Sequence, residues 1–188
     1  MAGADRGHGP FVVTLGFDPE TFGRLDALRS RYFPPGRNFL PAHLSLFHSL
    51  PTGEGEEIGR TLAEVAAASG PIPLRFPGIF RLGRGVALRV EAPGLSAVHK
   101  RLATAFGPWL TPQDRQPFRP HVTVMNKAEK AEAELAFATI GAGWEPWEGL
   151  GTGLLLWTYE GGPWDSVAEY RFGGGSGTTA GGRDSGPP

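Results

Sequence analysis

The sequence predicts an α+β fold built from two similar βαβαβ-type halves that share a core, with the helices on the outside. Two observations predict it. Strand-like and helix-like segments alternate along the chain, and the same order of strand, helix and loop twice leads to a histidine-bearing strand, from Phe11 to His43 and from Arg84 to His121. We expect such a duplication to set equivalent strands side by side about a pseudo-twofold axis.

The first half opens with a strand at 11–17, because the residues FVVTLGF are largely β-branched or aromatic. A helix follows, since Asp18 is a favourable N-cap residue and Pro19 suits the first helical position. Its apolar residues recur at helical spacing, namely Phe22, Leu25, Leu28 and Tyr32. The half is expected to continue with a strand at 43–50, a helix over about 55–69 and a strand near 72–80.

The second half repeats this order. The residues GVALRVEA at 85–92 predict a strand. The next segment places apolar residues on one helical face, namely Leu95, Val98, Leu102 and Phe106. A Pro-rich loop then leads to a strand at 121–126 and an Ala- and Glu-rich helix over about 128–139. The segment 154–172 is predicted to close the domain as a hairpin of two strands.

A chain of 188 residues is long enough for one domain. We expect a single two-lobed domain at 11–172, preceded by a flexible N-terminus at 1–10. The tail at 173–188, GGGSGTTAGGRDSGPP, lacks the apolar residues needed to offset the entropy of ordering. It is therefore predicted to be disordered.

The composition argues against several classes of protein. Without cysteine the chain has no disulfide, no thiolate metal site and no cysteine nucleophile. A formal net charge of −1 disfavours a protein that coats duplex nucleic acid through counterion release. The N-terminal residues lack the apolar core of a secretory signal, and no apolar run approaches the length of a membrane span. We expect a soluble, cytoplasmic protein, and nothing in the sequence requires more than a monomer.

Two short motifs repeat a histidine and a hydroxyl residue at one spacing: His43 with Ser45, and His121 with Thr123. Residues two apart in a strand share a face, so each pair points one way while its leucine or valine neighbours point the other. The apolar face suits packing against helices, whereas burying a histidine and a hydroxyl without partners is costly. Each polar face is therefore expected to line a cleft.

Two histidines at one cleft suit the cleavage of a phosphodiester. Attack by water or by a ribose 2′-hydroxyl needs a base for the nucleophile and an acid for the leaving oxygen, and histidine can be either near neutral pH. Neighbouring hydroxyls can donate hydrogen bonds to the non-bridging oxygens as negative charge develops there. One such motif is more often structural than catalytic, but two matched copies favour a function.

The motifs HLSL and HVTV resemble the paired signature of the 2H phosphoesterase superfamily. The longer segments RNFLPAHLSLFHSLP and FRPHVTVMNKA are similar to its bacterial 2′-5′ RNA ligase-like branch, and the similarity covers most of 11–172. Ser45 stands where threonine is commoner in the family, and it keeps the hydroxyl donor.

The resemblance implies a bilobal fold in which both motifs face a central cleft between antiparallel sheets. It also implies hydrolysis or reversible ligation at 2′,5′-linked or 2′,3′-cyclic phosphates of RNA ends and small nucleotides. The histidines would be the acid and the base, the hydroxyl residues would hold the phosphate, and neither a metal nor another cofactor would take part.

Three further residues are candidates for binding the substrate. Lys127 shares the parity of His121 if the strand extends that far, and Arg119 is one of the cations that flank the second histidine. Phe47 shares the parity of His43, which would let it stack on a base. The alternatives are a solvated surface for the two cations and core packing for Phe47.

Other residues are given structural roles. His48 is five residues from His43, which in a regular strand places it on the opposite face among leucines. His99 is expected to be exposed on its helix, while Trp157 and Tyr159 are expected to pack in the core. No HExxH or carboxylate-rich pattern supports a metal site.

Two functions stay open at this point. The first is a metal-independent phosphodiesterase, and the second is a non-catalytic module that holds a phosphorylated ligand or an RNA end in the same cleft. The presence of all four motif residues favours the enzyme. The sequence does not separate hydrolysis from ligation, or the acid histidine from the base, because both motifs offer the same groups.

Overall fold

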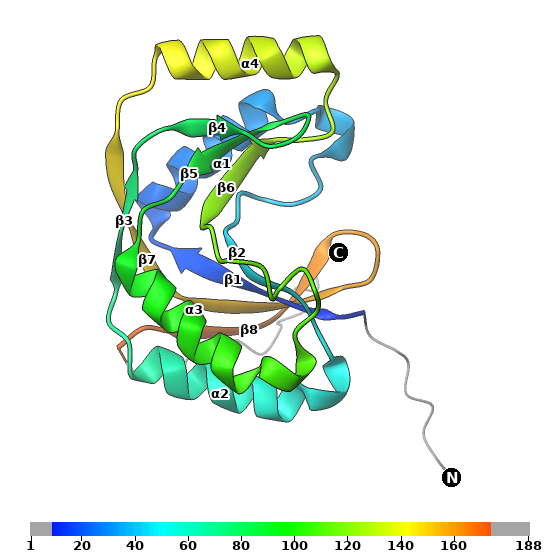
Figure 1. Ribbon diagram of the computed structural model, residues 1–188, viewed down its shortest axis with the longest axis vertical. Coiled ribbons are helices and arrows are strands. Elements are labelled where there is room, and N and C mark those ends of the chain that lie inside the picture. The colour runs from blue at the N-terminus through cyan, green and yellow to red at the C-terminus, as the bar shows by residue number, and fades with distance from the viewer. Residues whose placement is uncertain (1–8, 174–188) are drawn as a thin grey trace, which may run out of the picture.

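The computed structural model of the protein describes residues 9–173. Its elements, in chain order, are β1 (Phe11–Phe17), α1 (Pro19–Tyr32), η1 (Pro35–Arg37), β2 (Ser45–Leu50), η2 (Thr52–Glu54), α2 (Gly55–Ala67), β3 (Ile72–Phe76), β4 (Ile79–Arg81), β5 (Val86–Arg89), α3 (Pro93–Ala105), η3 (Gly107–Trp109), β6 (His121–Met125), α4 (Lys130–Ala142), β7 (Trp147–Tyr159) and β8 (Trp164–Arg171). Figure 1 shows their arrangement.

The predicted flexible N-terminus and glycine-rich tail lie outside the described residues, except for 9–10 and Gly173. Pro10 lies against the sheet, because its carbonyl oxygen accepts a hydrogen bond of 3.1 Å from the Tyr159 backbone N–H. The described residues therefore begin just before the predicted start of the domain.

The described strands form two antiparallel sheets. In the large sheet the order is β2-β1-β7-β3, and in the small sheet it is β4-β5-β6. The long strand β7 pairs with β3 through its first part and with β1 and β8 through the rest. This mixture of antiparallel sheets and separate helices confirms the predicted α+β class.

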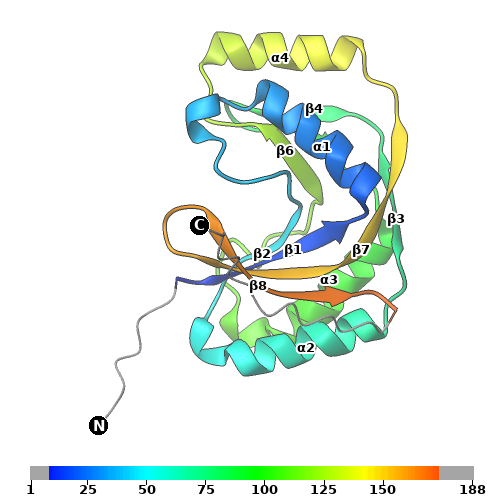
Figure 2. The ribbon, with the colours of Figure 1, turned by 180° about the vertical axis from the view of Figure 1, so that it is seen from behind.

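The helices cover the outer faces of the two sheets, as predicted. In Figures 1 and 2, α2 and α3 lie together beneath the large sheet, while α1 and α4 lie against the small sheet. Helix α1 thus follows a strand of the large sheet but packs on β6 of the small one. Helix α1 therefore connects the large sheet, which contains the preceding strand β1, to the small sheet on which it packs.

The order of elements in the first half, β1-α1-β2-α2-β3, recurs as β5-α3-β6-α4-β7. However, the equivalent strands β2 and β6 belong to different sheets and do not pair. The expectation that equivalent strands lie side by side is therefore wrong for these two. The motif-bearing strands approach the cleft from separate sheets.

The strand expected near 72–80 is two strands. β3 joins the large sheet and β4 joins the small sheet, with Pro77 and Gly78 between them. A Pro-Gly pair is a turn signal, and proline cannot donate a hydrogen bond to a strand partner. The chain therefore passes from one sheet to the other at this dipeptide.

The predicted start of α1 is confirmed in atomic detail. The Asp18 carboxylate accepts hydrogen bonds from the backbone N–H groups of Glu20 at 3.0 Å and Thr21 at 3.2 Å, and Pro19 follows the cap directly. A cap of this kind contributes about 1 kcal/mol to helix stability. It fixes the position from which α1 crosses to the small sheet.

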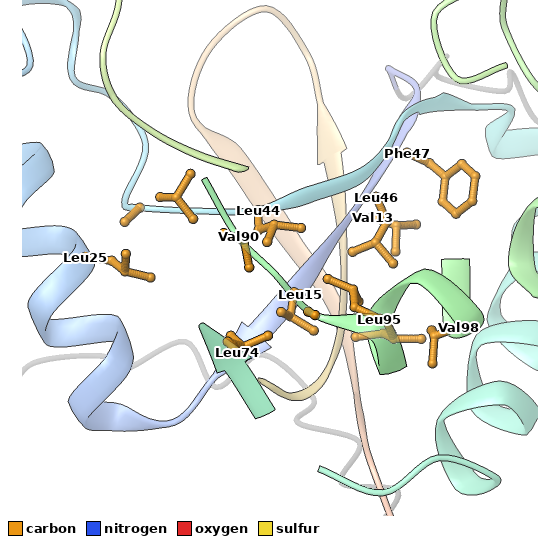
Figure 3. Packing of buried hydrophobic residues seen from close by; sticks show 14 of the residues in the cluster. Val13, Leu15, Leu25, Leu44, Leu46, Phe47, Leu74, Val90, Leu95 and Val98 are labelled. Carbon is orange, nitrogen blue, oxygen red and sulfur yellow. The ribbon is translucent and has the colours of Figure 1, made fainter. Parts of the chain in front are cut away.

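Each motif strand turns its apolar side inward. Leu44 and Leu46 are buried in the core beside Val13 and Leu15 of β1, as Figure 3 shows, and Val122 and Val124 are fully buried. The alternation predicted for the start of each motif is therefore confirmed.

Within the described residues, no helix is both long and apolar enough to cross a membrane.

Candidate active site

His43 lies two residues before β2 and is half-buried. Its Nδ1 is 2.8 Å from the Pro41 carbonyl oxygen. A carbonyl oxygen can only accept a hydrogen bond, so Nδ1 carries the hydrogen. In the neutral ring, Nε2 is then the nitrogen with a free lone pair. The Trp164 ring lies against the imidazole, with centroids 4.7 Å apart and planes tilted by 51°.

His121, the first residue of β6, is held in the same way. Its Nδ1 is 2.8 Å from the Arg119 carbonyl oxygen, again two residues earlier in the chain. The edge-on Phe80 ring lies beside it, with centroids 5.8 Å apart. Both motifs therefore fix the imidazole through Nδ1 and leave Nε2 for a proton transfer.

A pocket of about 640 Å³ joins the two motifs. His43 from the first motif and Thr123 from the second both line it, together with Lys127 and Trp164. Its walls come from both sheets and from the β7–β8 turn, which Figures 1 and 2 show beside β2. Each motif therefore contributes one residue, His43 or Thr123, to the lining of this pocket.

The pKa of His43 is lowered from 6.5 to about 4. Burial is the main cause, and it outweighs the Pro41 carbonyl, which favours the charged ring. The positive charges of Arg29, His48 and His121 lower the pKa further. His43 is therefore neutral at pH 7, and the two motif histidines lie close enough for one charge to affect the other.

The remaining predicted residues are not all gathered in the pocket. Thr123 lines it, whereas Ser45 and His121 are half-buried and are not part of its lining. Lys127 lines it although β6 ends before it. Arg119 has an exposed side chain, and its contact with the site is the carbonyl oxygen that holds His121.

Phe47 does not reach the pocket. Its side chain is fully buried and packs between His99, stacked at 4.8 Å, and the edge of Phe106. Figure 3 shows it at the edge of the core cluster, beyond Leu46 and Val13. The expectation that it stacks on a base is corrected, and the alternative of core packing holds.

The cause is a break in the alternation of β2. The pairing with β1 shifts between Ser45 and Phe47, so Leu46 and Phe47 are both buried. Past such an irregularity the parity of the strand is reversed. His48 is consequently exposed and lines the pocket with His43, contrary to the expectation that it lies among leucines.

Arg29 of α1 is a pocket residue that the sequence analysis missed. It is buried, its Nε donates to Asn38 Oδ1 at 2.9 Å and to the Leu40 carbonyl at 2.8 Å, and its Nη1 donates to the Thr123 carbonyl at 2.8 Å. Burial lowers the pKa of its guanidinium to about 10, although the charge of Asp26 opposes this. Arg29 therefore stays cationic and connects the segment before His43 to the second motif.

Trp157 and Tyr159, near the β7–β8 turn, were expected to pack in the core, and for Tyr159 this expectation is wrong. Tyr159 is exposed and lines the 640 Å³ pocket, while Trp164 lines both this pocket and a neighbouring one of about 350 Å³. Trp157 lines the smaller pocket and donates from Nε1 to Thr14 Oγ1 at 2.9 Å. The GGPW turn was the available signal, because a tryptophan beside a tight turn lies at a sheet end rather than in its core.

Within residues 9–173, no three histidine and carboxylate side chains are grouped so that they could hold a metal ion. Catalysis without a metal remains a prediction.

Both the sequence and the fold are similar to those of known proteins. Residues 17–163 match the family model described as the 2′-5′ RNA ligase superfamily. No curated protein sequence matches the chain.

Several solved structures share the fold. LigT of Escherichia coli, solved with 3′-AMP, superposes with a TM-score of 0.63 at 16% identity, covering 88% of this chain and 98% of its own. TT0787 of Thermus thermophilus gives a TM-score of 0.60 at 17% identity, with the same coverage. LigT complexed with NADP+ gives 0.57 at 14% identity, covering 88% and 99%.

Proposed function

The chain belongs to the 2′-5′ RNA ligase superfamily, and from that premise we propose that it is a 2H-type phosphodiesterase acting without a metal. Its substrates would be 2′,3′-cyclic phosphates or 2′,5′-linked phosphodiesters of RNA ends or small nucleotides. The observation that carries the proposal is the matched anchoring of two imidazoles. Each donates Nδ1–H to the carbonyl two residues earlier, so each offers Nε2 to a ligand. Solved structures of LigT with 3′-AMP and NADP+ support a nucleotide as the ligand.

In the proposed hydrolysis, water attacks the phosphorus of a cyclic phosphate while one histidine takes its proton at Nε2. The P–O bond to the leaving ribose oxygen breaks, and the other histidine, protonated beforehand, gives that oxygen a proton. The hydroxyls of Ser45 and Thr123 donate hydrogen bonds to the non-bridging oxygens, where negative charge develops. Arg29 and Lys127 supply positive charge at the same pocket.

We assign the base to His43. Its burial keeps the ring neutral at pH 7, with a pKa of about 4, so Nε2 has a free lone pair. His121 then supplies the proton to the leaving oxygen. For ligation, a 5′-hydroxyl takes the place of water: His43 accepts its proton, its oxygen bonds to phosphorus, the P–O3′ bond breaks, and His121 gives O3′ a proton, which leaves a 2′,5′ linkage.

The test replaces each histidine by glutamine, which keeps the approximate volume of the side chain. We expect His43→Gln and His121→Gln each to lower kcat on a nucleoside 2′,3′-cyclic phosphate by about 10²–10⁴-fold, measured with a chelator present and with the products identified. Arg101→Gln, an exposed change on α3, is the control.

Full turnover by either histidine variant, with an unchanged melting temperature, contradicts the proposal. The competing function is a non-catalytic module for phosphorylated ligands or RNA ends. It is favoured if the wild-type protein binds these substrates and returns them unchanged after long incubation.

A further inference from the structure

A histidine outside the two motifs also lines the pocket of the candidate active site. His48 is 45% exposed at its side chain, and its Nδ1 is 2.9 Å from Oδ1 of Asp114, whose side chain is completely buried. The imidazole thus donates Nδ1–H to a carboxylate and turns its other nitrogen, Nε2, away from that carboxylate. His48 and His43 line the same pocket.

The surroundings of Asp114 hold this pair rigidly. The carboxylate also accepts hydrogen bonds from the backbone N–H groups of His48 at 2.8 Å and Ser49 at 3.2 Å, and from Thr111 Oγ1 at 3.0 Å. Burial raises the pKa of Asp114, but these hydrogen bonds together lower it below its ordinary value. The carboxylate is therefore ionised and remains a counterion when the imidazole carries a proton.

The pocket itself is built for negative charge. Besides His48, the basic side chains of Arg29, Arg37 and Lys127 line it, and no carboxylate does among the residues that the structure describes. Its volume of about 640 Å³ lies in the range for whole small-molecule ligands, which leaves room for more than one phosphate group.

His48 and His43 both line this space, each through a ring held by its own partner. They are five residues apart along an extended segment, and the two rings are anchored to different partners, Asp114 and the Pro41 carbonyl. His48 therefore offers the pocket a hydrogen-bond donor of its own, distinct from the Nε2 of His43.

We propose that His48, held by Asp114, binds a second phosphate of the substrate, on the 5′ side of the reacting nucleotide. The proposal rests on the proposed function for the identity of the reacting phosphate. A 2′,3′-cyclic phosphate is the 3′ end of its chain, so any second phosphate lies on its 5′ side. The preferred substrate is then the end of an oligonucleotide or a 5′-phosphorylated nucleotide, and not a lone cyclic nucleotide.

Binding of two product analogues tests this without relying on turnover. Adenosine 3′-monophosphate and adenosine 3′,5′-bisphosphate differ only in the 5′-phosphate. By calorimetry, we expect the wild-type protein to bind the bisphosphate at least about 10-fold more tightly, as a charge-assisted hydrogen bond allows. His48→Gln should remove this preference and leave the Kd of the monophosphate unchanged.

The control and the second variant keep the result interpretable. Arg101→Gln removes an exposed charge outside the pocket and should keep the full preference. Asp114→Asn should reduce the preference while the protein stays folded by circular dichroism; if it unfolds, His48→Gln decides alone.

Two results overturn the proposal: an equal loss of affinity for both ligands in His48→Gln, or a preference for the bisphosphate that survives this change. Neither depends on catalysis, so a failure of the proposed phosphodiesterase activity is seen separately, in the turnover of His43→Gln and His121→Gln.

Discussion

The imidazoles of His43 and His121 are anchored alike, but of the two it is His43 that lines the 640 Å³ pocket. Trp164 and the buried Arg29 line the same pocket. The surroundings, rather than the motif, therefore make the two imidazoles different. At this scale the sequence predicted the residue types and their shared direction. It could not predict the pKa of His43, because Arg29 and Trp164 approach it from distant parts of the chain.

Stability is expected to report the burial of His43. Its pKa of about 4 in the folded protein is below the ordinary 6.5, so between these pH values the unfolded chain binds the extra proton. The free energy of unfolding should therefore fall as the pH is lowered from 6.5 towards 4. Urea denaturation of the wild-type protein and His43→Gln across this range measures the effect, with the variant showing the weaker pH dependence. Parallel curves for the two proteins would contradict the lowered pKa.

Strand β2 shows how one irregularity redistributes roles along an element. The alternation holds from His43 to Leu46 and then reverses, so that Phe47 enters the core and His48 enters the pocket. No local residue pattern marks this shift, because Phe47 is placed by contacts with residues distant in sequence. These are His99 on α3 and Phe106, the residue that follows α3. His99 was expected on the surface, but it is buried between Phe47 and Phe118. Its place is likewise set by contacts with residues distant in sequence.

Replacing Phe47 separates packing from binding. Phe47→Leu should lower the free energy of unfolding by about 1–2 kcal/mol, since it leaves space beside His99, and should leave KM unchanged. Trp164→Leu is the contrasting change, because it removes the ring beside His43 and is expected to lower kcat/KM. A higher KM for Phe47→Leu at unchanged stability would show that this ring does contact the substrate.

Other elements were predicted closely because their signals are local. The cap at Asp18 and the apolar spacing of α1 place that helix correctly, and the strands β1, β5 and β6 lie within their expected ranges. The assignment of strands to sheets was less predictable. Pairing partners are distant in sequence, so the separation of β3 from β4 depends on contacts that no window of residues contains.

At the scale of the whole molecule, residues from two separate sheets line one pocket. Arg29 connects them, because its guanidinium donates hydrogen bonds both to the Leu40 carbonyl before β2 and to the Thr123 carbonyl within β6. Single-sequence reasoning passed over it, since an arginine on a helix is usually a surface residue. Its burial becomes visible only when α1 is seen packed on the small sheet.

Arg29→Met is expected to impair both stability and activity. It leaves the carbonyl groups of the half-buried residues Leu40 and Thr123 without their donor, which should lower the free energy of unfolding by about 1–3 kcal/mol. We expect kcat/KM to fall at least about 10-fold, whereas Arg29→Lys should recover part of it by keeping the charge. Arg31→Met, an exposed change on the same helix, is the control. Unaltered kinetics in Arg29→Met would mean that the two sheets hold the histidines without this link.

The position of β7 bears on how the protein matures during synthesis. β1 and β3 are both made early, yet each pairs along one edge with β7, a strand that starts at Trp147. A nascent chain halted before that residue carries both histidine motifs but lacks the strand that joins β1 to β3. A ribosome must therefore translate most of the described domain before β1 and β3 can be joined in one sheet.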